Sequence, residues 1–184
     1  MKFTATQLPE VVLVEPAIHR DARGFFLETF HQGKFRAAGL DLAFVQDNHS
    51  KSQRGTLRGL HAQRLHPQGK LVRVLRGQIF DVAVDIRPGS PTFGQHASAV
   101  LSDENFHQLW VPPGFAHGFC VTSEVAEVEY KCTDLYSPGD EIGVRWNDPA
   151  LGIAWPVGEP ILSGKDAALP TLAELRRTLV GSAG

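Results

Sequence analysis

The chain has 184 residues, of which 42% are hydrophobic and 21% are charged, as in an ordinary globular protein with one core. Its 18 basic and 20 acidic residues give a net charge of −2, so no net field attracts nucleic acid or an anionic membrane. The sequence shows neither an apolar run of membrane-spanning length nor a signal-peptide pattern. We therefore expect one domain over residues 1–184, located in the cytoplasm.

Two short helices are expected, one on each side of a strand-rich centre. The first covers Lys34 to Ala38, and Gly39 closes it, because glycine readily adopts the left-handed conformation at a helix end. The second follows Thr171 and Glu174, which have the spacing of a capping box. The rest of the chain carries few helix signals.

Between residues 56 and 146, Gly and Pro interrupt the sequence at short intervals. The run from Ile79 to Ile86 alternates in part, with Phe80 and Val82 on one face and Asp81 on the other. Many short strands at regular spacing predict an all-β sandwich or barrel. The strand-like runs cover residues 71–75, 79–86, 97–101, 108–111, 119–122 and 125–132.

The chain contains two cysteines, Cys120 and Cys132. They lie in different strand-like runs, and their spacing fits no metal site. We expect two reduced, buried thiols.

Two segments resemble the motifs of the cupin superfamily. Residues 55–77 resemble the first motif, G-x5-H-x-H-x3,4-E-x6-G, and residues 112–117, PPGFAH, resemble the second, P-x-G-x2-H. In metal-binding cupins, the histidines and the glutamate of these motifs bind one ion inside the barrel. The resemblance implies that His61 and His117 share the interior of a small barrel.

The ligand positions of these motifs are only partly kept. Gln63 replaces the second histidine, and Lys70 takes the place of the glutamate after a longer gap. A lysine ammonium has no lone pair and repels a divalent cation in a low-dielectric cavity. Two imidazoles and a carboxamide make a poor site without an anionic ligand. We therefore expect no metal, with Lys70 supplying fixed positive charge.

A buried cation beside a histidine suits proton abstraction next to a ketone. The histidine removes a carbon-bound proton, and the cation stabilises the enolate that forms. A second acid on the other face can return a proton, and a lysine cation nearby makes that proton easier to give up. Such a sequence inverts a stereocentre with no redox cofactor.

Eight short segments, in chain order, carry a more specific pattern. They are DARGFFLE at 21–28, QDNHSKS at 46–52, LRGLHAQ at 57–63, DVAVDIR at 81–87, SPTFG at 90–94, GFAHGF at 114–119, YKCT at 130–133 and WNDP at 146–149. Together they resemble the dTDP-4-dehydrorhamnose 3,5-epimerase family. One departure is Leu135, where many members have a tyrosine.

This resemblance implies four catalytic residues. His61 is the general base, and Tyr130 is the general acid on the opposite face of the sugar. Lys70 stabilises the enolate oxygen, and Asp166 orients the base. Taken alone, each of these residues could be structural; their spacing and the family pattern together favour catalysis.

The resemblance also implies a substrate-binding set. Arg23 and Arg58 stand next to glycines, and the planar fork of arginine suits a diphosphate. Tyr136 matches a second pocket tyrosine. The whole set is Arg23, Glu28, Gln46, Asp47, Asn48, Arg58, His117, Tyr136, Glu141 and Lys165.

The expected protein is a cupin-like jelly roll with a few short helices. The resemblance implies a homodimer in which N-terminal strands extend the partner's sheet, and in which Arg23 and Glu28 serve the partner's site. It implies inversion of C3 and C5 of dTDP-4-dehydro-6-deoxy-D-glucose, which yields the 4-keto precursor of dTDP-L-rhamnose.

Two alternatives remain from the sequence. One is a relative that inverts a single centre, or a ketoisomerase acting on a related dTDP-4-keto sugar. The other is a cupin that only binds a sugar, or one that uses a metal held by His61 and His117. The number of centres inverted depends on how the ring turns in the pocket.

Overall fold

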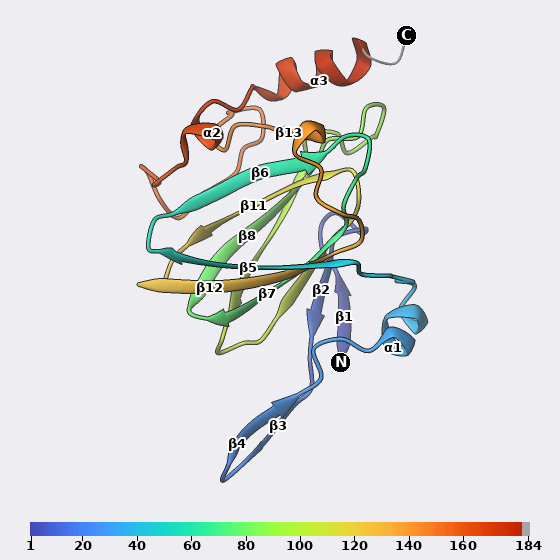
Figure 1. Ribbon diagram of the computed structural model, residues 1–184, viewed down its shortest axis with the longest axis vertical. Coiled ribbons are helices and arrows are strands. Elements are labelled where there is room, and N and C mark those ends of the chain that lie inside the picture. Colours follow the sequence, from blue (N-terminus) through green and yellow to red (C-terminus); the bar gives the residue numbers. More distant parts are fainter. Residues whose placement is uncertain (182–184) are drawn as a thin grey trace.

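The computed structural model describes residues 1–181 and contains two antiparallel β-sheets that face each other (Figure 1). The first sheet has the order β1 (Lys2–Ala5), β2 (Val12–Glu15), β10 (Gln108–Val111), β7 (Lys70–Arg76), β12 (Val125–Cys132) and β5 (Gln46–Gln53). The second has the order β13 (Glu141–Gly143), β6 (Leu57–Gln63), β11 (Phe115–Val121), β8 (Gln78–Asp85) and β9 (His96–Ser102). This all-β, cupin-like arrangement confirms the expected fold class.

The α-helices flank the run of strands from β5 to β13. They are α1 (Gln32–Ala37), α2 (Gly164–Ala167) and α3 (Leu172–Gly181), together with a 3-10 turn at Pro138–Asp140. In α3 the expected capping box is complete: Thr171 N donates to Glu174 Oε2 at 2.8 Å, and Glu174 N donates to Thr171 Oγ1 at 3.2 Å. The last residues of the expected domain, 182–184, lie outside the described residues.

The first helix begins earlier than the sequence predicts. It starts at Gln32 rather than Lys34, because the His31 side chain accepts a hydrogen bond from Lys34 N at 3.4 Å and caps the helix. It ends at Ala37, one residue before the expected end, and Gly39 beyond it has a φ of +85°, as expected of a closing glycine. No helix in residues 1–181 is long and apolar enough to cross a membrane.

Among the expected strands, β10 and β12 have the predicted bounds, whereas β11 begins at Phe115 rather than Phe119. Both faces of β8 are buried. Val82 and Val84 pack on the outer side, while Asp81 and Asp85 point into the barrel with no exposed surface. The aspartates on the second face of β8 are therefore interior residues, where polar groups need partners.

Three apolar clusters cover the faces of the sheets. One fills the space between the two sheets and includes Leu109 and Val128. The second packs α3 and the chain before it against the outer face of β6 and β8, through residues such as Leu175. The third packs Phe35 of α1 on Trp110, on the outer face of the other sheet. The central cluster occupies only part of the interior, and the remainder is polar.

A hairpin of β3 (Ile18–Asp21) and β4 (Gly24–Leu27) projects from this body (Figure 1). Its apolar side chains are not covered by the chain itself: Phe25 is 55% exposed and Phe26 is 71% exposed. Two neighbouring exposed phenylalanines are unusual on the surface of a monomer and point to a contact with another molecule.

Candidate active site

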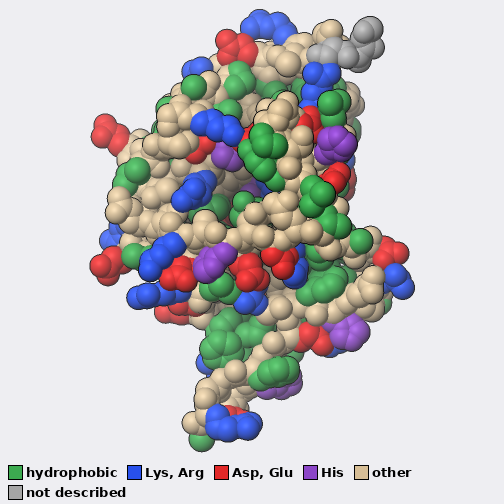
Figure 2. All heavy atoms as spheres, viewed as in Figure 1, with side chains coloured by type: hydrophobic (Ala, Val, Ile, Leu, Met, Phe, Trp, Pro, Cys, Tyr) green, Lys and Arg blue, Asp and Glu red, His purple; other side chains and the backbone are tan. Residues whose placement is uncertain are grey.

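Inward-facing polar side chains gather at one end of the barrel. They line two adjoining cavities of about 230 and 310 Å³. Figure 2 shows this region as a hollow with histidine and basic side chains around it. The residues common to both cavities are His61, Lys70, Tyr130, Tyr136 and Glu141. Strands of both sheets contribute to this set, so the sugar-sized space lies between the sheets.

His61, on β6, is paired with a buried carboxylate. Its Nε2 lies 2.5 Å from Asp166 Oδ1 and 3.9 Å from Glu141 Oε1. Asp166 is 4% exposed and sits in α2, where Ser163 Oγ caps the helix by accepting from Asp166 N at 3.1 Å. Burial acts to raise the pKa of Asp166, but the hydrogen bond and charge of His61, together with hydrogen bonds from Ser163 and Gly59, lower it overall. An ionised Asp166 holds a proton on Nε2 and leaves Nδ1 with the lone pair that a base needs.

Lys70, the first residue of β7, is buried beside His61. Its Nζ lies 3.5 Å from the backbone oxygen of His61. Burial lowers the pKa of Lys70, while the nearby Cys132, Glu141 and Asp81 act in the opposite direction. When Lys70 is protonated, its charge lies in a dry setting and acts strongly on a nearby oxygen.

Tyr130, on β12, approaches the same space from the other sheet. Its ring centroid lies 6.4 Å from that of His117. Burial raises the pKa of the Tyr130 hydroxyl, and the cation that opposes this effect is Arg58. The expectation that Lys70 eases release of this proton stays a prediction. The hydroxyl stays protonated at neutral pH and is suited to be a proton donor.

Glu141 organises the mouth of the pocket. Its Oε2 accepts hydrogen bonds from Tyr136 Oη at 2.9 Å and from Lys165 Nζ at 2.5 Å. Burial acts to raise the pKa of Glu141, but these two donors lower it overall. The loop before it is tied down by Gln63, which accepts from Ser137 N at 2.8 Å. Gln63 is thus occupied in holding the loop.

Strand β5 presents its polar residues alternately. Gln46, Asn48 and Ser50 face inward and line the cavities. The hydroxyl of Ser50 is buried without a partner among residues 1–181, and the sequence reasoning did not single it out. Ser52 is also buried and accepts from Arg58 Nε at 3.0 Å, which fixes the direction of the guanidinium.

Three expected substrate contacts lie outside the pocket within one chain. Asp47 is on the opposite face of β5, because alternate residues of a strand point to opposite sides. Its side chain is 58% exposed and pairs with Lys131 at 2.9 Å. Arg23 sits at the tip of the projecting hairpin with its side chain 90% exposed, and Glu28 pairs with Lys34 at 2.7 Å.

The remaining members of the expected set come together. Gln46, Asn48, Arg58, His117, Tyr136, Glu141 and Lys165 all line one or both cavities, as do His61, Lys70, Tyr130 and Asp166. Within residues 1–181, no three His, Cys, Asp or Glu side chains are grouped to hold a metal ion. The expectation that no metal takes part stays a prediction.

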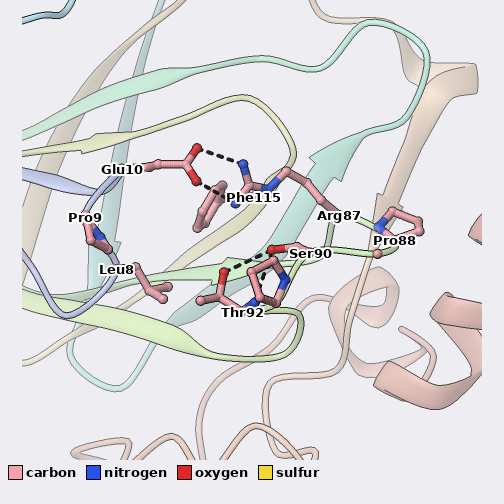
Figure 3. A pocket seen from close by; sticks show the side chains of 10 residues that line it. Leu8, Pro9, Glu10, Arg87, Pro88, Ser90, Thr92 and Phe115 are labelled. Atoms are coloured by element: carbon pink, nitrogen blue, oxygen red, sulfur yellow. Dashed lines mark hydrogen bonds and ion pairs between the residues drawn. The ribbon is translucent and has the colours of Figure 1, made fainter.

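A separate cavity of about 490 Å³ lies where Arg87 and Phe115 meet the N-terminal segment (Figure 3). Arg87 donates to both oxygens of Glu10, at 2.7 and 2.8 Å, and its guanidinium carbon lies 4.6 Å from the centre of the Phe115 ring. The hydroxyls of Ser90 and Thr92 both donate to Asp85 at 2.6 Å. Because these groups satisfy one another, this cavity offers a ligand little hydrogen bonding.

Comparisons with known proteins agree with one another. Residues 5–174 match the family model for dTDP-4-dehydrorhamnose 3,5-epimerase. Curated proteins of that name from Neisseria gonorrhoeae and Methanothermobacter thermautotrophicus are 55% and 50% identical. The alignments cover 97% and 94% of this chain, and the chain spans 55% of the first protein and 95% of the second.

A solved structure gives the same result. The dTDP-6-deoxy-D-glucose-3,5-epimerase of Legionella pneumophila, in complex with dTDP-4-keto-L-rhamnose, superimposes with a TM-score of 0.91 at 52% identity. The match covers 95% of this chain and 96% of that protein.

Proposed function

The chain belongs to the dTDP-4-dehydrorhamnose 3,5-epimerase family, and from this premise we propose how its pocket epimerises dTDP-4-dehydro-6-deoxy-D-glucose at C3 and C5. The protein is an isomerase of dTDP-L-rhamnose biosynthesis. The single observation that carries the assignment of roles is the placement of a base and an acid on opposite sheets. The His61–Asp166 pair and Tyr130 line one cavity, with the buried Lys70 beside them.

His61 removes the proton from a carbon next to the 4-keto group. The electrons move to the keto oxygen, and the Lys70 ammonium stabilises the enolate. Asp166 stabilises the imidazolium that results, at its Nε2–H. Tyr130 then donates its hydroxyl proton to the opposite face of the carbon, which inverts the centre. Exchange with water returns His61 and Tyr130 to their starting states.

The same groups act on both centres. The 4-keto group acidifies the C–H bonds on each side of it, so one base and one acid serve C3 and C5 in turn when the ring reorients. Neither step changes an oxidation state, so neither requires a redox cofactor.

The nucleotide end of the substrate occupies the mouth. Arg58, whose direction is set by Ser52, and Lys165 supply positive charge there. A diphosphate needs such local cations because the chain as a whole is slightly negative. The ring of Tyr136 is 50% exposed at this mouth and offers a flat surface for the thymine base.

The projecting hairpin supports a homodimer in which each chain completes the other's pocket. Phe25 and Phe26 are exposed on it, and together with Arg73, Leu75 and Phe106 they line an open groove. A second copy would cover this apolar surface. Arg23 at the hairpin tip would then reach the partner's pocket, which explains why it lies far from its own.

Mixing two defective variants tests this arrangement. We expect His61→Ala and Arg23→Ala to be impaired separately and to recover turnover when unfolded and refolded together. A mixed dimer holds one site with an intact base and an intact arginine from the other chain. The control is a refolded chain carrying both substitutions, mixed with itself. If the mixture gains nothing over its components, Arg23 does not act across the dimer.

The cytoplasmic location of the protein stays a prediction.

Proton NMR of the 4-keto sugar nucleotide in D2O tests the reaction itself. We expect the protein to replace the protons at C3 and C5 with deuterium and to produce the L-rhamno product. A downstream reductase with NADPH traps that product. Uptake at one carbon only would instead assign a single-centre epimerase, and no uptake at either carbon would contradict the proposed function.

A further inference from the structure

Strand β8 carries two buried aspartates on its inward face, and their surroundings differ. Asp85 accepts five hydrogen bonds: from Arg87 N, Nε and Nη2, Ser90 Oγ and Thr92 Oγ1, at 2.6 to 3.0 Å. Asp81 accepts one, from His117 Nε2 to Oδ1 at 2.7 Å. Its Oδ2 is buried and has no partner among residues 1–181. Burying a carboxylate oxygen without a hydrogen-bond donor lowers the stability of the fold, which suggests that this carboxylate has a function.

The partner of Asp81 lies at the centre of the pocket. His117 is directly opposite His61 in the register of β11 and β6, and it lines the cavity with Tyr130 and Arg58. Asp81 does not line the cavity; it sits behind His117. Both side chains are almost fully buried, His117 at 6% and Asp81 at 0%. The one side chain of the pocket to which Asp81 is hydrogen-bonded, within residues 1–181, is therefore His117.

The contact determines which ring nitrogen of His117 carries a proton. A carboxylate can only accept, so Nε2 must be the donor. The other nitrogen, Nδ1, makes no hydrogen bond with residues 1–181 and is the only one left for a ligand. Fixing one tautomer also fixes the edge of the ring that meets the sugar.

The charge of Asp81 also reaches the enolate-stabilising cation. Asp81 is one of the three groups that raise the pKa of Lys70 against the lowering effect of burial. Replacing it with a neutral side chain removes this support. Asp81 thus affects two groups next to the reacting part of the sugar: His117, through a hydrogen bond, and Lys70, through its charge.

We infer that Asp81 is a positioning residue of the reaction: it holds the proton on Nε2 of His117, so that Nδ1 is presented to the sugar beside the carbon that His61 deprotonates. This inference rests on the proposed function and deepens it. Asp85, on the same strand and equally buried, has no such role, because every group it contacts belongs to the corner around Arg87.

The tautomer of His117 can be measured without any turnover. Long-range ¹H–¹⁵N correlation spectra of the ¹⁵N-histidine-labelled protein report which ring nitrogens are protonated, and loss of one signal set in His117→Gln assigns the residue. We expect Nε2 of His117 to carry a proton throughout pH 6–9. An unprotonated Nε2 in this range would overturn the inference, whatever the protein catalyses.

The variant Asp81→Asn tests the consequence. An amide can either donate to or accept from Nε2, so the tautomer is no longer fixed and the charge is gone. We expect kcat to fall ~10–100-fold, as for other residues that orient a functional histidine. The Kd for dTDP, which lacks the 4-keto hexose that would meet His117, should stay the same.

The matched control is Asp85→Asn, which removes the same charge at the same depth. Its folded fraction should keep a wild-type kcat and a wild-type His117 spectrum. If Asp81→Asn kept a wild-type kcat in an active protein, the inference would fail while the proposed function stood. If the wild-type protein had no epimerase activity, the proposed function would be wrong, and the NMR measurement would still show which ring nitrogen of His117 carries the proton. If Asp81→Asn did not fold, the spectrum of the wild-type protein would still decide.

Discussion

The corner around Arg87 and the pocket around His61 are both rich in buried charge, but they use it differently. In the corner, Arg87 is held by Glu10 and Asp85, and every oxygen of Asp85 has a donor. In the pocket, Lys70 has only a long contact to a backbone oxygen, and Ser50 and Asp81 keep buried oxygens without partners in the described chain.

The difference separates polar groups that hold the fold from those that wait for a substrate. A closed network compensates the cost of burying its charges and adds rigidity. In an open network, part of the cost of burying the charges is not compensated in the free protein, and the bound substrate supplies the missing contacts. Substitutions in the corner around Arg87 should therefore lower mainly the stability of the protein, and substitutions in the pocket around His61 should lower mainly its turnover.

The largest expected effect on turnover is that of His61→Ala. A general base contributes ~10²–10⁴-fold to the rate, and both deuterium uptake and epimerisation should fall by that amount. The melting temperature should change little, since the residue belongs to the open network. Near-normal deuterium uptake by this variant would remove His61 from the role of base.

The largest expected effect on stability is that of Asp85→Asn. It leaves Arg87 without its buried counter-ion and weakens the hydrogen bonds from Ser90 and Thr92. Breaking a buried ion pair from one side costs about 3–5 kcal/mol, which urea unfolding would measure. If the free energy of unfolding stayed the same while kcat collapsed, the division between the two regions would be wrong.

A smaller effect concerns the alkaline limb of the pH profile. Burial lowers the pKa of Lys70 below its usual value near 10.5, whereas burial raises that of Tyr130. As the pH rises, Lys70 therefore loses its proton first, and kcat should fall at a pH below 10.5. Lys70→Arg keeps the charge, so its remaining activity should persist to higher pH. An unchanged limb in that variant would exclude Lys70 as the group responsible.

The smallest effect is expected for Asp47→Ala, because that side chain faces solvent and pairs only with Lys131. Its KM should remain within about twofold of the wild type, as for exposed ion pairs that contribute little. The matched variant is Asn48→Ala on the inner face of the same strand, which should raise KM clearly more. Equal effects of the two would show that β5 does not separate the pocket from solvent in this way.

The sequence predicts several strands with apolar inner faces and misses β5, whose polar inner face lines the pocket. β10 and β12 have apolar inward residues, and their bounds follow from the pattern. β5 reads QDNHSKSQ, polar at every position, because its inner face meets a substrate instead of the core. Periodicity has nothing to detect in such a strand.

The candidate site follows the same division. His61 and Lys70 are singled out by motif spacing, and Tyr130 by the YKCT segment of the family pattern. The role of Asp81 could not be predicted from the sequence, because Asp81 acts through His117 and no sequence motif links these two positions. Arg23 and Glu28 show a further limit, because residues that serve another copy of the chain have no visible partner within one copy.

The most direct test of the account is deuterium exchange by Tyr130→Phe, measured at C3 and C5 against product trapped by the reductase. The substitution keeps the ring and its contact with His117 but removes the one proton that Tyr130 can give. With His61 intact, abstraction continues and the proton returns to the face it left. We expect this variant to retain deuterium uptake and lose most inversion. Product formation at the wild-type rate would show that Tyr130 is not the acid, and it would contradict a mechanism in which His61 and Tyr130 act on opposite faces of the sugar.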